Sequence, residues 1–387
     1  MSPMLKVQRV ESPGDLAALA KDCARLALAM DPRSPFASSE WLLLWWRHFR
    51  EDRLLVRDEF YVHAVRDEQG ALVAIAPLML TERPANGPLR CRSLSFFGGD
   101  KNVTELRGLI CAPEHEAVVT RALLAHFQQR SDEWDWLAWN GVRKDSEAYA
   151  VLNAADNFEW CRETTDYVLP LPATWEEFRA SRSRNIKESL RKCYNSLKRA
   201  GHRFELRVIE EPSELPRALA RFFELHTRRA NASHLARHVD VFATAQSRKL
   251  LLDLAALPRE ISQLRVFQLE IAGSVVAARL GFLMGDELYL YFSGYEPGWS
   301  GFSVMTTTVA EAIKWALERE VRLVNLSPGT DVSKTRWSAS PITTCEGVLL
   351  SQTPRGRLAF GVLHELNERA APGTLFGKVA SLARRHG

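Results

Sequence analysis

The 387-residue sequence lacks any apolar run near the ~20 residues that a membrane-spanning helix needs. Its longest apolar runs, "WLLLWW" (residues 41–46) and "LVAIAPLML" (residues 72–80), are far too short. The N-terminal stretch "MSPMLKVQRVESPGD" also lacks the apolar segment of a secretory signal. We therefore expect no integral membrane segment and a cytoplasmic location.

Cysteine is scarce and scattered. The six cysteines form no CxxC pair and no metal-ligand spacing, so they indicate reduced thiols and no metal site.

Net charge is also scarce outside one segment. Residues 351–387 hold six Lys or Arg and two Glu, which equals the whole net charge of +4. The rest of the chain is neutral, and this excludes a DNA-binding protein that works by overall charge.

The length and composition indicate a globular protein with more than one domain. Hydrophobic residues make up 46% and charged residues 25%, which are ordinary values, and 387 residues exceed one common core. The stretch "VLPLPAT" (residues 168–174) interrupts any regular element. We predict an N-terminal domain over residues 1–170, a second domain over residues 171–350, and a basic helical tail over residues 351–387.

Two stretches of the chain resemble each other. Residues 61–78 and 265–282 each read as a strand, a glycine turn and a second strand, aligned on Gly70 and Gly273. Helical patterns precede each stretch, and further strands and a helix follow it. Such hairpins are common, so chance is an alternative, but the shared order of elements favours two copies of one mixed α/β unit.

The stretch "YFSGYEPGWSGFSVMTTTVAEAIKWALER" (residues 291–319) joins an apolar strand to a helix through a glycine-containing loop. Backbone N–H groups are free at a helix start, and the helix dipole favours negative charge there. This pattern predicts an anion site, such as a phosphate or pyrophosphate site, at residues 298–303.

The stretch "SRSRNIKESLRKCYNSLKRAG" (residues 181–201) predicts a helix with two distinct sides, which Gly201 ends. The buried side consists of Ile186, Leu190, Cys193 and Leu197. The basic side consists of Arg184, Lys187, Arg191 and Lys198. A basic side of this kind either binds an anionic substrate or is simply solvated, and the second is more common.

The order of elements over residues 271–337, from "IAGSVVAARLGF" to "SPGTDVSKTRW", resembles the GNAT-fold acetyltransferases of the cellulose-biosynthesis type. These are double-GNAT proteins, similar in arrangement to the Fem-type peptidyltransferases. The family ends this region with a Gly-x-x-x-Tyr-Lys-x-x-Trp-like element. Here Lys334 and Trp337 match that element, and Ser333 replaces the tyrosine. The resemblance covers roughly residues 40–350.

The resemblance implies a mixed α/β (α+β) fold of two tandem GNAT-like domains, each a mixed, mostly antiparallel sheet flanked by helices. It also implies an acyltransferase that moves an acetyl or other acyl group from acyl-CoA to an amine or hydroxyl acceptor. The acceptor would be a small molecule or a saccharide, as in polysaccharide biosynthesis. The N-terminal domain, which lacks the glycine loop, is expected not to bind CoA.

In this fold the strand at residues 287–293 splays from the parallel strand at residues 322–326 and admits the pantetheine arm. The resemblance therefore implies these CoA-binding residues: Tyr295, Gly298, Trp299, Ser300, Gly301, Phe302 and Ser303. Two alternatives stay open. The basic helix favours Fem-type transfer from aminoacyl-tRNA, and the absence of Lys or Arg in the loop favours a non-catalytic protein in polysaccharide regulation.

Candidate site residues follow from the chemistry of acyl transfer, which needs a base, oxyanion stabilisation and a proton for the thiolate. The catalytic candidates are Lys334, Asp331, Tyr291 and His226. The substrate-binding candidates are Asp100, Arg184, Lys187, Arg191 and Trp337, the last packed over the same spot as Lys334. Packing or surface roles are the alternatives for each of them.

Overall fold

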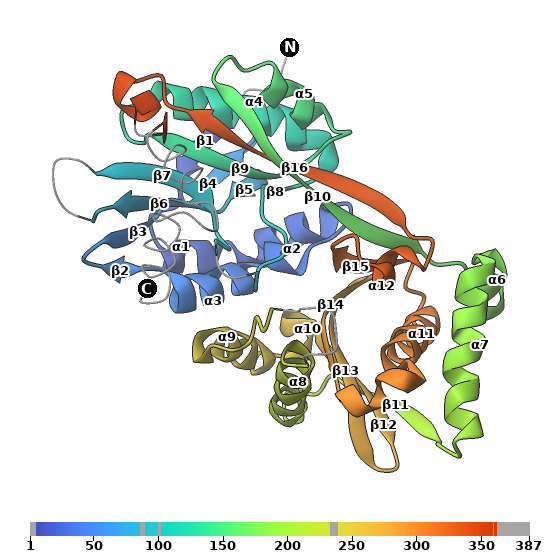
Figure 1. Cartoon of the computed structure of the whole chain (residues 1–387). Coiled ribbons are helices and arrows are strands. Elements are labelled where there is room, and N and C mark those ends of the chain that lie inside the picture. Colours follow the sequence, from blue (N-terminus) through green and yellow to red (C-terminus); the bar gives the residue numbers. More distant parts are fainter. Residues whose placement is uncertain (1–4, 86–89, 100–101, 233–238, 359, 362–387) are drawn as a thin grey trace.

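The computed structural model of the chain describes residues 5–85, 90–99, 102–232, 239–358 and 360–361 (Figure 1). The fold has a first half, up to residue 157, and a second half, which begins at residue 171. One long pair of strands, β10 (Phe158–Pro170) and β16 (Ser340–Leu350), runs from one half to the other.

The first half contains five α-helices and nine strands among its described residues. The helices are α1 (Pro13–Ala18), α2 (Ala20–Ala29), α3 (Ser39–Phe49), α4 (Pro113–Gln129) and α5 (Glu147–Asn153). The strands are β1 (Lys6–Arg9), β2 (Asp52–Arg53), β3 (Val56–Phe60), β4 (His63–Arg66), β5 (Leu72–Ala76), β6 (Leu78–Arg83), β7 (Cys91–Phe96), β8 (Ile110–Cys111) and β9 (Trp136–Arg143). A 3₁₀ helix, η1 (Pro35–Ala37), precedes α3.

The second half holds its helices on both faces of a sheet. The helices are α6 (Trp175–Ser181), α7 (Arg184–Arg199), α8 (Leu215–Ala230), α9 (Ala245–Ala255), α10 (Arg259–Ser262), α11 (Val304–Leu317), α12 (Val332–Thr335) and the 3₁₀ helix η2 (Pro297–Phe302). The strands are β11 (Phe204–Ile209), β12 (Leu264–Ile271), β13 (Ser274–Met284), β14 (Glu287–Tyr295) and β15 (Leu323–Pro328).

One twelve-stranded sheet passes through both halves in the order β11-β12-β13-β14-β15-β10-β16-β9-β7-β6-β3-β2, and a second sheet has the order β1-β4-β5-β8. Among the described strands of the twelve-stranded sheet, parallel pairing occurs once in each half: between β14 and β15, and between β7 and β9. The predicted fold class is confirmed: the sheet is mixed and mostly antiparallel, and helices flank it.

Both predicted hairpins are present. Gly70 (φ +83°) joins β4 to β5, and Gly273 (φ +75°) joins β12 to β13, because glycine takes positive φ without a Cβ clash. The two hairpins differ beyond the turn. Pro77 lies between β5 and β6 and has no N–H for the ladder, so β5 ends in the four-stranded sheet and β6 begins in the twelve-stranded sheet, whereas β13 stays continuous.

Strand β16 falls within the predicted second domain, but it does not belong to the second half alone. It pairs with β10 on one side and with β9 of the first half on the other. One hydrophobic core is also shared, because Trp41 and Phe97 of the first half pack in the same cluster as Phe222 and Tyr291 of the second. The domain boundaries at residues 170 and 350 stay predictions, and residues 362–387 of the predicted tail lie outside the described residues.

The predicted basic helix is α7. Its buried stripe, Ile186, Leu190, Cys193 and Leu197, is at most 3% exposed, and Gly201 (φ +74°) follows its end. This helix packs with α11 on one face of the second-half sheet, while α8 and α9 pack on the other.

Gly294 on β14 sets the distance between that strand and α8. A Cβ at Gly294 would lie 2.3 Å from the backbone nitrogen of His226. We expect Gly294→Ala to lower the free energy of unfolding by about 2 kcal/mol, because backbone cannot yield as a flexible side chain can. Urea denaturation measures this. Gly298→Ala is the control, since a Cβ there meets nothing within 4 Å, and equal stabilities of the two variants would contradict the close packing.

Candidate functional site

Strands β14 and β15 separate along their length. They pair at only three positions, from Glu287 opposite Leu323 to Tyr289 opposite Asn325. Beyond these, β14 continues along β13 as far as Tyr295, while β15 continues along β10 as far as Pro328. The predicted splay is confirmed. We call the space between residues 290–295 and residues 326–328 the wedge.

The glycine loop forms the 3₁₀ helix η2 and leads into α11. Ser303 between them has a left-handed backbone (φ +54°). A Cβ at Gly298 or Gly301 would meet nothing within 4 Å, so the loop surface is open at both positions. The helix start therefore faces space that an anionic ligand can occupy.

The C-terminal end of helix α7 contacts this loop. The Ser196 hydroxyl donates to the Phe302 carbonyl at 3.5 Å, and the His202 ring lies 4.9 Å from the Trp299 ring. Because 16 helical residues span about 24 Å, only the last turn of α7 lies beside the loop. Lys198 and Arg199 on this turn are exposed.

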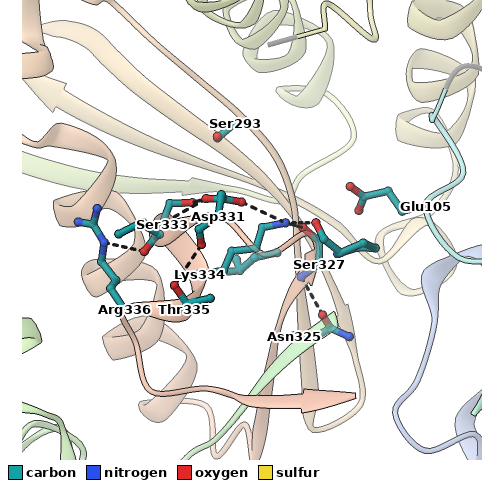
Figure 2. Close-up of polar contacts among 12 residues, drawn as sticks. Glu105, Ser293, Asn325, Ser327, Asp331, Ser333, Lys334, Thr335 and Arg336 are labelled. Atoms are coloured by element: carbon teal, nitrogen blue, oxygen red, sulfur yellow. Dashed lines mark hydrogen bonds and ion pairs between the residues drawn. The ribbon is translucent and has the colours of Figure 1, made fainter. Parts of the chain in front are cut away.

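Four ionisable side chains form a charged cluster at the wedge, in which Asp166 and Arg279 are buried and Glu105 and Lys334 are partly buried. The Tyr289 hydroxyl donates to Glu105 Oε2 at 2.8 Å, which joins a first-half loop to β14. Lys334 has a side chain only 12% exposed, and its Nζ donates to Ser327 Oγ at 3.1 Å and to the Pro328 carbonyl. Figure 2 shows this lysine reaching toward Ser327, with Glu105 beyond it.

Burial shifts the pKa values of this cluster toward neutrality. It raises the pKa of Glu105 to about 7 and of Asp166 to about 6, although Lys334 opposes both shifts. Burial also lowers the pKa of Lys334, against the attraction of Glu105, and that of Arg279 to about 10. Groups that change protonation near neutral pH can exchange protons with a substrate, which is a common property of active sites.

Of the predicted catalytic residues, the structure brings Lys334 into this cluster, with Asp331 at its edge. Asp331 caps α12: its side chain accepts from the Ser333 backbone at 3.0 Å, and its Oδ2 lies 4.0 Å from Lys334 Nζ. Although burial raises the pKa of Asp331, the Ser333 hydrogen bonds bring it below its usual value.

Tyr291 and His226 lie in buried surroundings. Tyr291 is 2% exposed, and its hydroxyl donates to the Val103 carbonyl, so it fixes the same first-half loop that carries Glu105. A catalytic role for Tyr291 stays a prediction. His226 is 5% exposed, contacts Phe222, Phe242 and Phe292, and shares a hydrogen bond with the Ser293 carbonyl.

Trp337 is 1% exposed and packs in the core with Phe178. Its predicted place over Lys334 stays a prediction. Among the other substrate-binding candidates, Arg184 pairs with Glu188 at 2.8 Å and Lys187 donates to the Ala180 carbonyl. These two and Arg191 lie on α7, outside the charged cluster, and Asp100 lies outside the described residues.

Three members of the cluster were missed from the sequence. Glu105 lies five residues after the predicted Asp100, in the loop that follows β7. Arg279 carried a signal that could have found it, because a charge inside the apolar stretch "VVAARLGF" must have a buried partner or a function. Asp166 had no such signal, since it ends the mostly polar part of β10.

The described residues contain no group of three or more His, Cys, Asp or Glu side chains that could hold a metal ion. Within the described part of the chain, no helix is both long and apolar enough to cross a membrane.

The segment that forms the wedge is similar to a known family. Residues 183–335 match the family described as "Acetyltransferase (GNAT) domain". This segment includes β14, η2, α11, β15 and Lys334, so it covers the wedge and one side of the charged cluster.

Solved structures are similar over nearly the whole chain. The crystal structure of FemX has a TM-score of 0.59 at 11% identity, covering 91% of this chain and 99% of that one, which shows a common fold. L-PGS from Bacillus licheniformis has a TM-score of 0.49 at 11% identity, covering 93% and 98%. A tandem GNAT protein from the clavulanic acid biosynthesis pathway has a TM-score of 0.43 at 13% identity, covering 90% and 99%. No curated protein sequence matches this chain.

Proposed function

We propose that this protein is an acyltransferase that moves an acetyl or other acyl group from acyl-CoA to an amine or hydroxyl acceptor. The observation that carries the proposal is the parting of β14 from β15 directly beside Glu105 and Lys334. The GNAT match of the same segment supports it. As the family resemblance suggests, we further propose an acceptor of the saccharide type, used in polysaccharide biosynthesis.

The residues around the wedge suit an acyl-CoA. Beyond Tyr289, β14 has no strand partner on the side of β15 among the described residues, although the Leu290 carbonyl accepts from Arg279. The other backbone groups there can hydrogen-bond an extended amide chain such as pantetheine. The open loop at Gly298 and Gly301 and the start of α11 suit a pyrophosphate, with Tyr295 and Trp299 beside it. The exposed Lys198 and Arg199 add positive charge on the neighbouring turn of α7.

Two residues of the charged cluster, Glu105 and Lys334, then carry out the two proton transfers. The thioester supplies an activated acyl carbon. Glu105, with its pKa near neutrality, accepts the proton that the acceptor nitrogen or oxygen loses as it attacks. Lys334 holds positive charge next to the developing negative charge and donates a proton to the departing thiolate.

Calorimetry with acetyl-CoA, followed by a thiol-release assay with amine and alcohol acceptors, tests the proposal. We expect binding and transfer. A protein that binds aminoacyl-tRNA and not acetyl-CoA would replace this proposal with Fem-type transfer, an alternative that the exposed basic side of α7 favours. Binding without transfer to any acceptor would instead favour the non-catalytic alternative.

The loop prediction is tested separately. We expect Gly301→Val to weaken acetyl-CoA binding about tenfold, or 1.4 kcal/mol, because the added side chain occupies the ligand's space. The variant should fold normally, since a Cβ at Gly301 meets nothing within 4 Å. Gly361→Val, at another open glycine beyond β16, is the control. An unchanged affinity in the folded Gly301 variant would remove the loop from the site.

A further inference from the structure

Two arginines approach the same stretch of β14 from different elements. Arg279 lies on β13, and its Nη2 donates to the Leu290 carbonyl at 3.1 Å. Arg229 lies on α8, and its Nη1 donates to Ser293 Oγ at 2.7 Å. Leu290 and Ser293 belong to the part of β14 that has left β15, and Ser293 is also the register partner of Arg279. The two guanidinium groups therefore mark the side of the wedge that β14 forms.

Arg279 is a buried cation whose hydrogen bonds are incomplete. It is 8% exposed, and its Nε donates to no atom of the described residues. It also forms no ion pair within 4.0 Å with a described carboxylate, and Glu105 and Asp331 attract it from farther away. A buried charge without a direct partner is costly, and native proteins rarely keep one without a reason. An anion bound in the wedge would supply that partner.

The two arginines also repel each other. Burial lowers the pKa of Arg279, the positive charge of Arg229 lowers it further against the attraction of Glu105, and the result is about 10. Burial lowers the pKa of Arg229 as well. Both side chains still carry charge at neutral pH, since arginine hardly loses its proton in proteins. A like-charged pair of this kind favours an anion that both guanidinium groups can contact.

The position of the arginines indicates which part of a donor would carry this anion. The loop that suits the pyrophosphate of an acyl-CoA lies beyond the end of β14. Arg279 instead interacts electrostatically with Glu105 and Lys334, which serve the thioester in the mechanism proposed above. The acyl chain extends from that thioester, so its far end is the part of the donor that meets the arginines.

We propose that Arg229 and Arg279 bind a carboxylate at the far end of the acyl chain, so that the donor is a dicarboxylic acyl-CoA, of which succinyl-CoA is a short example. The inference rests on the acyl-CoA-dependent function proposed above and specifies its acyl group. Planar guanidinium groups hold a carboxylate through paired, charge-assisted N–H donors. The acceptor atom bonds the acyl carbon as the C–S bond breaks, its proton passes to Glu105, and the thiolate takes a proton from Lys334. The terminal carboxylate keeps its charge throughout.

Calorimetry with two stable thioether analogues tests the proposal without an acceptor. S-(3-carboxypropyl)-CoA ends in a carboxylate, whereas S-butyl-CoA has the same chain length and no charge on it. We expect the carboxylate analogue to bind at least about tenfold more tightly, because hydrogen bonds between charged groups are stronger than contacts with a methyl group. Equal affinity, or tighter binding of S-butyl-CoA, overturns the proposal.

Two variants locate the carboxylate at the arginines. Arg229→Gln and Arg279→Gln should each reduce the ratio of the two affinities about tenfold, since each removes a charged donor. Arg229 is only partly buried, so its variant remains informative if Arg279→Gln does not fold. Arg217→Gln, at an exposed position of the same helix α8, is the control and should keep the preference. Arginine variants that prefer the carboxylate analogue as strongly as the control does would contradict this location.

These measurements separate the inference from the proposed function. A protein that binds both analogues equally keeps its proposed function and refutes the inference. If succinate then bound to the complex with S-butyl-CoA, and Arg229→Gln weakened that binding, the carboxylate would belong to the acceptor and not to the acyl group. A protein that binds neither analogue nor acetyl-CoA refutes both the function and the inference.

Discussion

Glu105→Gln is expected to lower the rate of acyl transfer on the order of 10³-fold, which is within the usual range for one general base. Glutamine keeps the size of the side chain and can still accept the Tyr289 hydrogen bond that glutamate accepts at 2.8 Å. It cannot take a proton from the acceptor. Steady-state kinetics should therefore show a lower kcat, with the affinity for acetyl-CoA unchanged.

The pH dependence of kcat/KM tests the same variant independently. Burial raises the pKa of Glu105 to about 7, so the wild-type kcat/KM should fall as the pH falls through about 7, where the base becomes protonated. The glutamine variant should lack this acidic limb. A variant that loses rate but keeps the limb would assign the titration to another group and contradict a base role for Glu105.

As the pH rises, the free energy of unfolding should fall in the range in which kcat/KM rises. Between the ordinary value of 4.5 and about 7, the folded protein holds more protons on Glu105 than the unfolded chain does. The free energy of unfolding therefore falls as the pH rises through this range. Glutamine removes that cost, so at pH 8 the variant should melt no lower than wild type. A large drop in Tm would show that the carboxylate is structural.

The elements that the sequence predicted well depend on local pattern. The stripe of α7 was visible because four apolar residues recur at helical spacing, and all four are buried. The turns at Gly70 and Gly273 were visible because few residues other than glycine adopt positive φ. The separation of β14 from β15 was foreseen through the family resemblance, and the pairing confirms it.

The parts that were missed depend on contacts between distant segments. Glu105 reaches β14 across 184 positions, and no local pattern shows that Tyr289 would donate to it. Trp337 follows Lys334 by three residues, yet the short helix α12 and the turn after it direct the tryptophan into the core and the lysine toward Ser327. The site thus combines a second-half wedge with a first-half loop, and a reading of each half alone could find only one side.

Lys334→Met is expected to reduce the rate of acyl transfer about a hundredfold, because it removes the charge and the donated proton beside the thioester. Burial lowers the pKa of Lys334, so proton donation near neutral pH is easier than for an exposed lysine. Methionine keeps the apolar stem. Thiol-release kinetics at saturating acetyl-CoA isolate this effect from donor binding.

The structure also predicts an effect of Lys334→Met on stability. Lys334 Nζ donates to Ser327 Oγ and to the Pro328 carbonyl, so it also fastens the turn at the end of β15. We expect Lys334→Met to lower the free energy of unfolding by about 2 kcal/mol, because it removes two hydrogen bonds and each has a usual net value of about 1 kcal/mol. Ser327→Ala is the matched control, because it removes one of these bonds and leaves the ammonium in place. If Ser327→Ala lost as much rate as Lys334→Met, the effect would belong to the shape of the turn, and the charge on Lys334 would have no part in the chemistry.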